Sequence, residues 1–346
     1  MAPKAKADDT AYKQLKKDIA AGTIGSLYVF HGEESYLRDF YLGKMRQKLL
    51  PAGMEEFNLH TLTGKEFDVK KLQEMVDCLP MMSERTLIVV NDYDLYKGDK
   101  EGLIRVLSDL PEYVCLVFVY DLIEYKADAR TKLAGLLKGR GSVVPFNRQG
   151  QNDLVDWISR RFRALDHDIG TEDAKYLMFL CGDLMNGLIS EIGKIGAYAK
   201  GHRVTRADID AVATPQLDAV VFQMTDAIAA GNFDRAASVL GDLFHMQEAP
   251  IKLLAVLGKQ IRQLYSARLA LEHRKGTAYL MEQWGMRNSY PAEKLMNAAR
   301  KFSLAWCRRA VIRCGEVDLA MKSTGADGEE LLIGLLMELA MPARDR

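Results

Sequence analysis

The sequence lacks the cysteine patterns that mark disulfide-stapled and zinc-binding proteins. It has five cysteines in 346 residues, at positions 78, 115, 181, 307 and 314. None of them forms a Cys-x-x-Cys pair and no histidine cluster accompanies them, so we do not expect a zinc site. Cys307 and Cys314 are seven residues apart in a helical pattern, and the resulting separation of about 10 Å is too long for a disulfide. We expect five free thiols in a reducing compartment.

The chain also lacks long apolar runs and an excess of one charge. No run approaches the ~18 apolar residues that a membrane-spanning helix needs, so no span is expected. Residues 1–18 contain lysines without an apolar core, which is not the pattern of a secretory signal. We expect Met1–Thr10 to be disordered, because it has no apolar periodicity. Basic and acidic residues number 47 each, and this balance argues against a protein that coats nucleic acid, although it leaves room for a local basic patch.

What is present is ample apolar sequence, arranged first as strands and helices in alternation. The length predicts two or three domains. Over residues 1–150 the alternation favours a mainly parallel sheet with helices on both faces. The expected strands are Leu27–His31, Phe57–Thr61, Thr86–Asn91, Cys115–Tyr120 and Ser142–Phe146. Because Pro145 cannot donate to a sheet ladder, we expect it at a sheet edge or at a strand end.

The character of the chain changes after this α/β region. Residues 151–214 have helical periodicity, and Asn152 or Asp153 is suited to cap the first helix. A capping box from Thr205 to Asp208 is expected to open the last helix of this segment. These patterns predict a small helical domain.

The remainder of the chain, residues 215–346, is helical by its period throughout and contains no internal repeat. Pro250 suits the first turn of a long leucine-rich helix. We expect two further helices after the Gly276–Pro291 stretch and one that closes the chain. The predicted domains are therefore 1–150, 151–214 and 215–346.

The loop after the first expected strand resembles a nucleotide-binding loop that has lost its chemistry. A working P-loop, GxxxxGK[ST], surrounds phosphates with N–H groups and supplies a lysine and a hydroxyl for Mg²⁺. This loop contains Gly32 alone, followed by Glu33 and Glu34, with no lysine. Carboxylates are themselves favoured at a helix N-terminus and would repel a triphosphate. We expect a degenerate site that is closed to ATP.

A second remnant follows the third expected strand. Thr86–Asn91 is apolar and runs into Asp92 and Asp94, which is the outline of a strand that holds Mg²⁺ in ATPases. Without a P-loop these residues are more simply ordinary acids at a strand end. The pattern indicates a structural relative of an ATPase, with no catalytic residue, metal ligand or cofactor of its own.

An apolar segment lies just before the same strand. Leu79-Pro80-Met81-Met82 ends a helix that we expect from Val69 to Cys78, because proline stops helices. The large side chains after it either point outward, as a knob for a partner's pocket, or tuck beneath the sheet. Periodicity alone leaves both alternatives open.

The chain resembles the delta subunit family of bacterial clamp loaders along nearly its whole length. The order and spacing of several stretches carry this resemblance, and no single stretch is decisive. They are LYVFHGEESYLRDF, CLPMMSERTLIVVND, KADARTKLAGLLKGRGSVVPF, GDLMNGLISEIGKIGAYA, VFQMTDAIAAGNFDRAASVL, KLLAVLGKQIRQLYSARLAL, ARKFS and EVDLAMKSTG.

The resemblance implies an AAA+-like module, made of a parallel-sheet α/β domain and a small helical lid, followed by a C-terminal helical collar that mediates oligomerisation. It implies a subunit without ATP hydrolysis, inside the nucleotidyltransferase complex of DNA polymerase III. Such a subunit is cytoplasmic and acts at the replisome, in association with the nucleoid. No catalytic residue, metal or cofactor is implied.

The resemblance also implies partners and a binding surface. The family contacts the sliding clamp (beta) through an apolar wedge, which in this sequence corresponds to Leu79, Met81 and Met82. Some members have Leu-Phe at this place, whereas the flexible methionines here can adapt to a pocket. The wedge opens one ring interface so that the clamp is loaded on primed DNA. The implied partners are the clamp, delta-prime, gamma/tau and, through the assembled loader, primer-template DNA.

Two other classes of function stay open. One is a divergent P-loop ATPase or nucleotide transferase, against which the lysine-free loop with Glu33 and Glu34 counts. The other is a helical adaptor unrelated to replication, which would bind a partner through its C-terminal bundle. No residue stands out as a reader of DNA, since a solvated helix face is the simpler interpretation for each candidate arginine. These candidates are Arg262, Arg268, Arg308, Arg309 and Arg313.

Overall fold

The computed structural model describes residues 10–340, so the expectation of disorder for Met1–Thr10 lies outside the described residues except at Thr10, which begins a helix. Contacts divide the chain into two compact units. The first runs to Gln149 and includes Leu184–Asn186, and the second comprises Gly150–Asp183 and the chain from Gly187 onward. The finer division of the second unit into a lid and a collar stays a prediction.

The first unit is built on a five-stranded sheet in which every pairing is parallel, in the order β2-β3-β4-β1-β5. The strands are β1 (Leu27–His31), β2 (Leu59–Thr63), β3 (Thr86–Asn91), β4 (Val114–Val119) and β5 (Ser142–Pro145). All five expected strands are present. The second begins later than expected, because Glu55–Asn58 forms a short helix, α3, ahead of it. Pro145 ends the edge strand β5, as its missing N–H requires.

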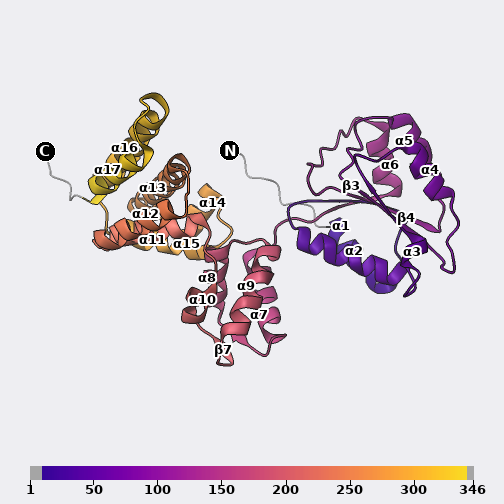
Figure 1. Ribbon diagram of the computed structural model, residues 1–346, viewed down its shortest axis with the longest axis horizontal. Coiled ribbons are helices and arrows are strands. Elements are labelled where there is room, and N and C mark those ends of the chain that lie inside the picture. Colours follow the sequence, from indigo (N-terminus) through magenta and orange to yellow (C-terminus); the bar gives the residue numbers. More distant parts are fainter. Residues whose placement is uncertain (1–9, 341–346) are drawn as a thin grey trace. The chain divides into compact units, whose positions relative to one another are not determined.

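Helices cover both faces of this sheet (Figure 1). They are α1 (Thr10–Ala21), α2 (Ser35–Leu49), α4 (Val69–Asp77), α5 (Lys100–Ser108) and α6 (Lys132–Arg140). Figure 1 shows α1 and α2 on one side and α4, α5 and α6 on the other. Alternate residues of each strand point to opposite faces of the sheet. Val29 and Phe118 pack in the core against α4, α5 and α6, whereas the residues next to them in the sequence are buried on the other face. Burial on both faces explains why β3 and β4 are apolar without alternation.

The parallel topology separates the two segments that the sequence singled out. The loop from Gly32 to Glu34 follows β1 and Asp92 follows β3, so both lie at the carboxyl edge of the sheet. The segment from Leu79 to Met82 precedes β3 and therefore belongs to the amino edge. The apolar segment and the remnant of a nucleotide site are thus on opposite edges.

The second unit begins with helices and a two-stranded parallel sheet. Its elements are α7 (Gln151–Arg163), β6 (Asp168–Ile169), α8 (Thr171–Cys181), α9 (Met185–Tyr198), β7 (Arg203–Val204) and α10 (Arg206–Val212), and the first residues of α9 group with the first unit. The expected cap of the first helix was wrong. Gly150 is the N-cap, since its carbonyl accepts from Leu154 N at 2.9 Å, and Asn152 and Asp153 lie inside the first turn.

The capping box at the last of these helices is confirmed. The Thr205 hydroxyl accepts from the Asp208 N–H at 3.4 Å, and the Asp208 carboxylate accepts from the Thr205 N–H at 2.8 Å. Two N–H groups that a helix start leaves without backbone partners are thereby satisfied.

In the described part of the chain, up to residue 340, seven helices complete the second unit around one apolar core. They are α11 (Leu217–Ala229), α12 (Phe233–His245), α13 (Pro250–Glu272), α14 (Thr277–Trp284), α15 (Ser289–Ala299), α16 (Leu304–Ser323) and α17 (Gly328–Ala340). The long α13 packs against α11, α15 and α16, and Pro250 is its first residue, as expected. The Gly276–Pro291 stretch was wrongly left without a helix, because it contains α14 and the start of α15, whose first turn accommodates Pro291. Among residues 10–340 no helix is both long and apolar enough to cross a membrane.

Candidate functional site

The loop after β1 is held in a shape that only glycine permits. Gly32 has φ +117°, and a Cβ atom built there would lie 2.3 Å from the carbonyl oxygen of Phe146. The Phe146 N–H donates to His31 O at 2.6 Å, and the Glu34 N–H donates to Phe146 O at 2.9 Å. A phosphate-binding loop aims such N–H groups at its ligand. Here the Glu34 N–H is directed to protein backbone instead.

The two glutamates of this loop have internal partners. Glu33 forms an ion pair with Arg148, whose Nε lies 2.6 Å from Glu33 Oε2. Glu34 is almost fully buried, and its Oε1 accepts from the N–H of Met185, in the first turn of α9, at 3.3 Å. The buried carboxylate of Glu34 therefore lies at the N-terminus of α9, a position at which helices commonly attract an anion.

The two acids after β3 organise turns. Asp92 has φ +54°, and its Oδ1 accepts from three successive N–H groups, those of Asp121 at 2.8 Å, Leu122 at 2.7 Å and Ile123 at 3.3 Å. Asp94 accepts from the N–H of Tyr96 at 3.0 Å. Across residues 10–340 no group of three potential metal-ligating side chains is found. This edge of the sheet has the outline of a nucleotide site, but its polar groups are engaged in holding the protein's own loops.

At the opposite edge the loop between α4 and β3 exposes three large apolar side chains within four residues. We call Cys78–Arg85 the apolar loop. The exposed fraction is 78% for Leu79, 54% for Met81 and 80% for Met82. These side chains stand in solvent rather than beneath the sheet.

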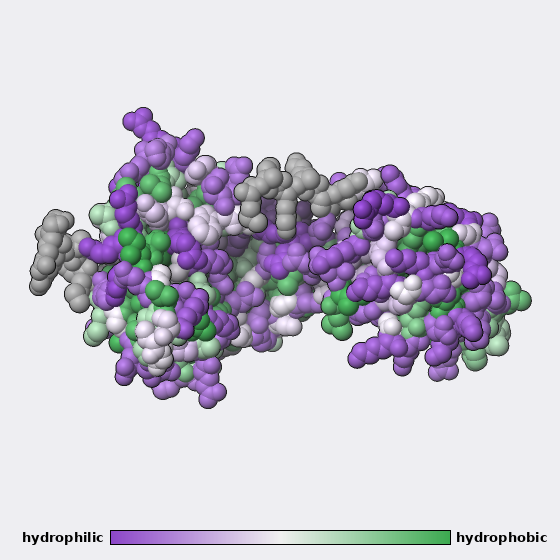
Figure 2. Space-filling model, turned by 90° about the horizontal axis from the view of Figure 1, so that it is seen from above, coloured by the Kyte–Doolittle hydropathy of each residue, from purple (hydrophilic) through white to green (hydrophobic). Residues whose placement is uncertain are grey.

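The density of exposed apolar residues is what sets this loop apart. Figure 2 shows hydrophobic side chains reaching the surface of the first unit in small patches among hydrophilic ones. Single exposed apolar residues, such as Leu122 at 87% exposure, are ordinary on protein surfaces. Three in four residues on one short loop form a candidate contact for an apolar pocket.

The far end of the apolar loop is tied to the sheet by Arg85. Its guanidinium donates to the carbonyl oxygens of Gly25 at 2.9 Å and Val114 at 3.1 Å, and also to that of Ile24. Ser83 closes a small turn, because its hydroxyl donates to Arg85 O and accepts from Arg85 N. The loop therefore enters β3 along a defined path.

Sequence reasoning missed one residue that contacts the loop directly. The Asn58 side chain is fully buried and forms two hydrogen bonds with the backbone of Met81. In the sequence Asn58 was simply part of the expected strand Phe57–Thr61. The only signal in the sequence was a polar residue inside an otherwise strand-like stretch. Such a residue does not indicate that its hydrogen-bond partner lies 23 positions away.

Two of the five arginines considered for DNA contact form ion pairs within the chain. Arg313 pairs with Glu338, with Nη2 and Oε1 2.6 Å apart, and Arg268 pairs with Glu272 at 3.2 Å. Surface pairs of this kind contribute little to stability, but they place both guanidinium groups beside a carboxylate of the chain itself. We assign no DNA contact to any of the five.

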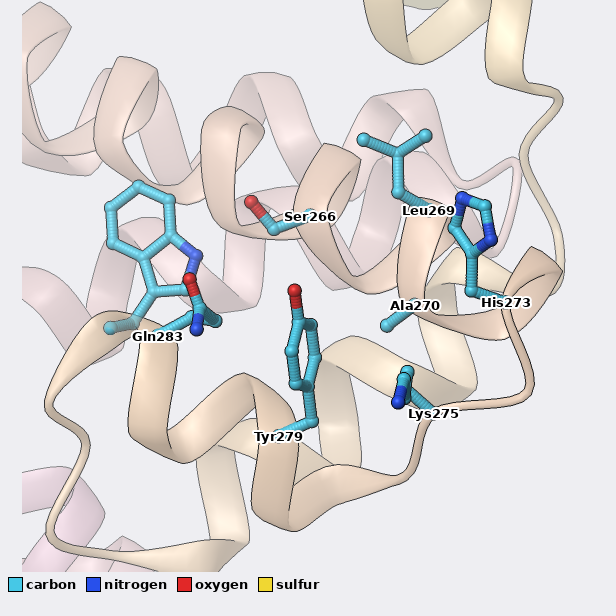
Figure 3. A pocket seen from close by; sticks show the side chains of 8 residues that line it. Ser266, Leu269, Ala270, His273, Lys275, Tyr279 and Gln283 are labelled. Carbon is cyan, nitrogen blue, oxygen red and sulfur yellow. The ribbon is translucent and has the colours of Figure 1, made fainter.

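A pocket of about 380 Å³ lies in the second unit between the end of α13 and α14 (Figure 3). Its lining includes His273, Lys275, Tyr279 and Trp284, and the Lys275 ammonium lies 5.9 Å from the centre of the Tyr279 ring. The Ser266 hydroxyl and the His273 ring are on separate sides of the pocket (Figure 3), so they do not form a nucleophile–base pair. The lining has no carboxylate or thiol. This pocket therefore does not support the enzyme alternative.

The five thiols differ in reactivity in a way that can be measured. Cys78, at the start of the apolar loop, is exposed and the other four are buried. Burial raises the pKa of Cys115 and Cys181 to about 12 and of Cys307 and Cys314 to about 11. Because the thiolate is the nucleophile, these four react slowly near neutral pH.

We expect a maleimide to label one thiol in the native chain at pH 7.5 and five after denaturation, with peptide mapping placing the native label on Cys78. Rapid native labelling of a second cysteine would contradict the described burial. Labelling in denaturant is the control that all five thiols are free.

Two models of known protein families match this chain, one in each of its two compact units. Residues 28–147 match the family model described as DNA polymerase III, delta subunit, and residues 218–339 match the model of its C-terminal domain. Together the two matches cover more than half of the chain. The chain belongs to the DNA polymerase III delta subunit family. It is also 24% identical over 334 residues, 94% of each chain, to the DNA polymerase III subunit delta of Bacillus subtilis.

A solved structure agrees with this membership at the level of the fold. The Bacillus subtilis DNA clamp loader delta protein superposes with a TM-score of 0.55 at 21% identity, covering 95% of this chain and 99% of that one. The expected α/β fold, a parallel sheet with helices that is followed by further helices, is confirmed. Its family membership makes the chain a delta subunit of DNA polymerase III.

Proposed function

We propose that this delta family member binds the sliding clamp through a wedge formed by Leu79, Met81 and Met82, and that binding opens one interface of the clamp ring. The observation that supports this most directly is the apolar loop, where three large apolar side chains are exposed within four residues. The loop is tied to the sheet through Arg85, so a force on the wedge is transmitted to the α/β domain.

The energy available from such a wedge is on the right scale for biasing one ring interface. Each buried apolar side chain of this size contributes about 1.5–3 kcal/mol. Two or three such side chains therefore contribute roughly 3–8 kcal/mol before ordering and association costs. Opening is then a shift of population, because the chain binds the open ring more tightly than the closed ring.

In this proposal the chain hydrolyses no ATP. The loop from Gly32 to Glu34 offers no lysine, and Asp92 holds a turn instead of a metal ion. ATP bound by partner subunits assembles the loader. The helices from Leu217 onward are the collar that joins this chain to delta-prime and gamma/tau. Primer-template DNA is contacted by the assembled ring.

The proposal is tested by mixing the purified wild-type chain with its cognate sliding clamp. We expect a complex to form without ATP. A pair of fluorophores across one clamp interface should separate when the chain is added. Failure of a folded chain to bind the clamp would remove the wedge proposal and favour the helical adaptor alternative. Binding without separation of the fluorophores would leave a clamp-binding protein that does not open the ring.

A separate measurement addresses the ATPase alternative. Titration calorimetry with ATP and Mg²⁺ is expected to show no binding at millimolar nucleotide, because Glu33 and Glu34 stand where a triphosphate needs positive charge. Saturable ATP binding by the isolated chain would contradict this expectation and restore the enzyme alternative. Binding of the clamp in the same preparation serves as the control that the chain is native.

A further inference from the structure

One buried amide holds the middle of the apolar loop. Asn58 Oδ1 accepts from the N–H of Met81 at 2.8 Å, and Asn58 Nδ2 donates to the carbonyl of Met81 at 2.9 Å. The same Nδ2 donates to Met54 O at 3.0 Å. The amide thus satisfies both polar groups of one residue, in the manner of a neighbouring strand, and connects the loop to α3.

The loop needs such support, because its conformation is not one that a free chain would choose. Met82 has φ +51°, a left-handed conformation that is unfavourable for a residue with a long side chain. The side chains of Leu79, Met81 and Met82 are exposed and so supply little packing of their own. The loop geometry must therefore be imposed by its hydrogen bonds.

The anchors are spaced along the loop. At its start the Cys78 N–H bonds to Glu74 O at the end of α4, and at its end Ser83 and Arg85 lock the entry to β3. Between these anchors the Met81 backbone is held by Asn58. Because Asn58 is fully buried and belongs to a different element, it fixes the loop from beneath while the exposed side chains stay free to enter a pocket.

We propose that Asn58 is a positioning residue that holds the apolar loop in its binding conformation before the clamp arrives. This inference rests on the proposed function and deepens it, since it assigns part of the clamp affinity to a residue that does not itself touch the clamp. Without the amide, the loop must be ordered at the moment of binding, and ordering a loop reduces affinity.

The test compares Asn58→Ala and Asn58→Asp with the wild type. The first variant removes both hydrogen bonds to Met81. The second keeps oxygen acceptors for the Met81 N–H but, when ionised, has no donor for the Met81 carbonyl. Tyr120→Phe is the matched control, because the buried Tyr120 hydroxyl accepts from the N–H of Leu95 at 2.9 Å, away from the apolar loop.

We expect both Asn58 variants to bind the clamp about tenfold more weakly than the wild type, a change that corresponds to about 1.4 kcal/mol. Tyr120→Phe should lower thermal stability by a similar amount and leave clamp affinity unchanged. Hydrogen exchange at the Met81 amide should become at least about tenfold faster in Asn58→Ala.

The outcomes separate the inference from the proposed function. Clamp binding by Asn58→Ala that equals the wild type, while Leu79→Ala/Met81→Ala/Met82→Ala has lost it, would overturn the role of Asn58 and leave the wedge standing. No binding by the wild type would overturn the proposed function, and the inference with it. Equal loss of affinity in Tyr120→Phe would show an effect of stability alone and would also overturn the inference.

Hydrogen exchange of the native wild-type chain tests the role of Asn58 without any substitution. Although its side chain is 54% exposed, the Met81 amide should exchange slowly. Rapid exchange of this amide in the native wild-type chain would show that Asn58 does not hold the loop.

Discussion

Replacing Leu79, Met81 and Met82 together by alanine is expected to lower the affinity for the sliding clamp by a hundredfold or more and to leave the stability of the chain nearly unchanged. The three side chains are 78%, 54% and 80% exposed, so the folded chain loses little packing when they are shortened. In the complex each contributes about 1.5–3 kcal/mol when buried. A loss of at least ~2.7 kcal/mol, or a hundredfold in Kd, is therefore expected. Titration of the clamp measures the affinity, and thermal unfolding measures the stability.

The matched control for this triple variant is Leu122→Ala. Leu122 is 87% exposed, but it follows β4 and so lies at the opposite edge of the sheet from the apolar loop. Its replacement should leave clamp affinity within about twofold of the wild type, since exposed side chains outside an interface have small effects. If the triple variant binds as well as the wild type, the clamp contacts another surface. If both variants bind weakly, exposed apolar residues contribute without a defined wedge.

The substitution Gly32→Ala is expected to destabilise the first unit by about 3–5 kcal/mol, the largest stability effect that we predict. The φ of +117° is unfavourable for alanine, and the added Cβ would lie 2.3 Å from Phe146 O. Because the nearest atoms belong to backbone, relief requires the loop to move. That movement disturbs the hydrogen bonds that link Phe146 to His31 and Glu34.

Gly43→Ala is the matched control for this prediction. Gly43 lies in the interior of α2, and nothing is within 4 Å of a Cβ atom built there. Alanine should stabilise that helix by up to about 1 kcal/mol. Unfolding is best followed by hydrogen exchange in β1 and β4. The three tryptophans, Trp157, Trp284 and Trp306, all lie in the second unit, so their fluorescence reports on the other unit as an internal reference.

Comparison of Gly32→Ala with Gly43→Ala tests whether backbone contact holds the loop after β1 in its shape. A loss below about 1 kcal/mol for Gly32→Ala would mean that the loop adapts freely, contrary to a shape imposed by backbone contact. A loss that also appears in tryptophan fluorescence would mean that the two units unfold together. The expected result is loss in the first unit alone.

The sequence predicted elements correctly where a local pattern of residues is compatible with only one kind of structure. Continuous apolar runs predicted β3 and β4 correctly, because strands buried on both faces need no polar alternation. The capping box at Thr205 was read correctly for the same reason, since its partners are three residues apart. Elements with weaker local signals were missed, among them α1, the short α3 and α14.

The sequence by itself determined the fold class, the absence of a phosphate-binding lysine after β1 and, through the resemblance, the residues of the candidate wedge. Periodicity left undecided whether Leu79, Met81 and Met82 point outward, and the tertiary structure shows them exposed. It also decided what surrounds them, because the determining contacts join distant positions. Asn58 reaches Met81 across 23 residues, and Glu34 reaches Met185 across 151. Local periodicity reports which way a side chain faces along its own element, whereas the partner that fixes a loop is chosen only when the chain has folded.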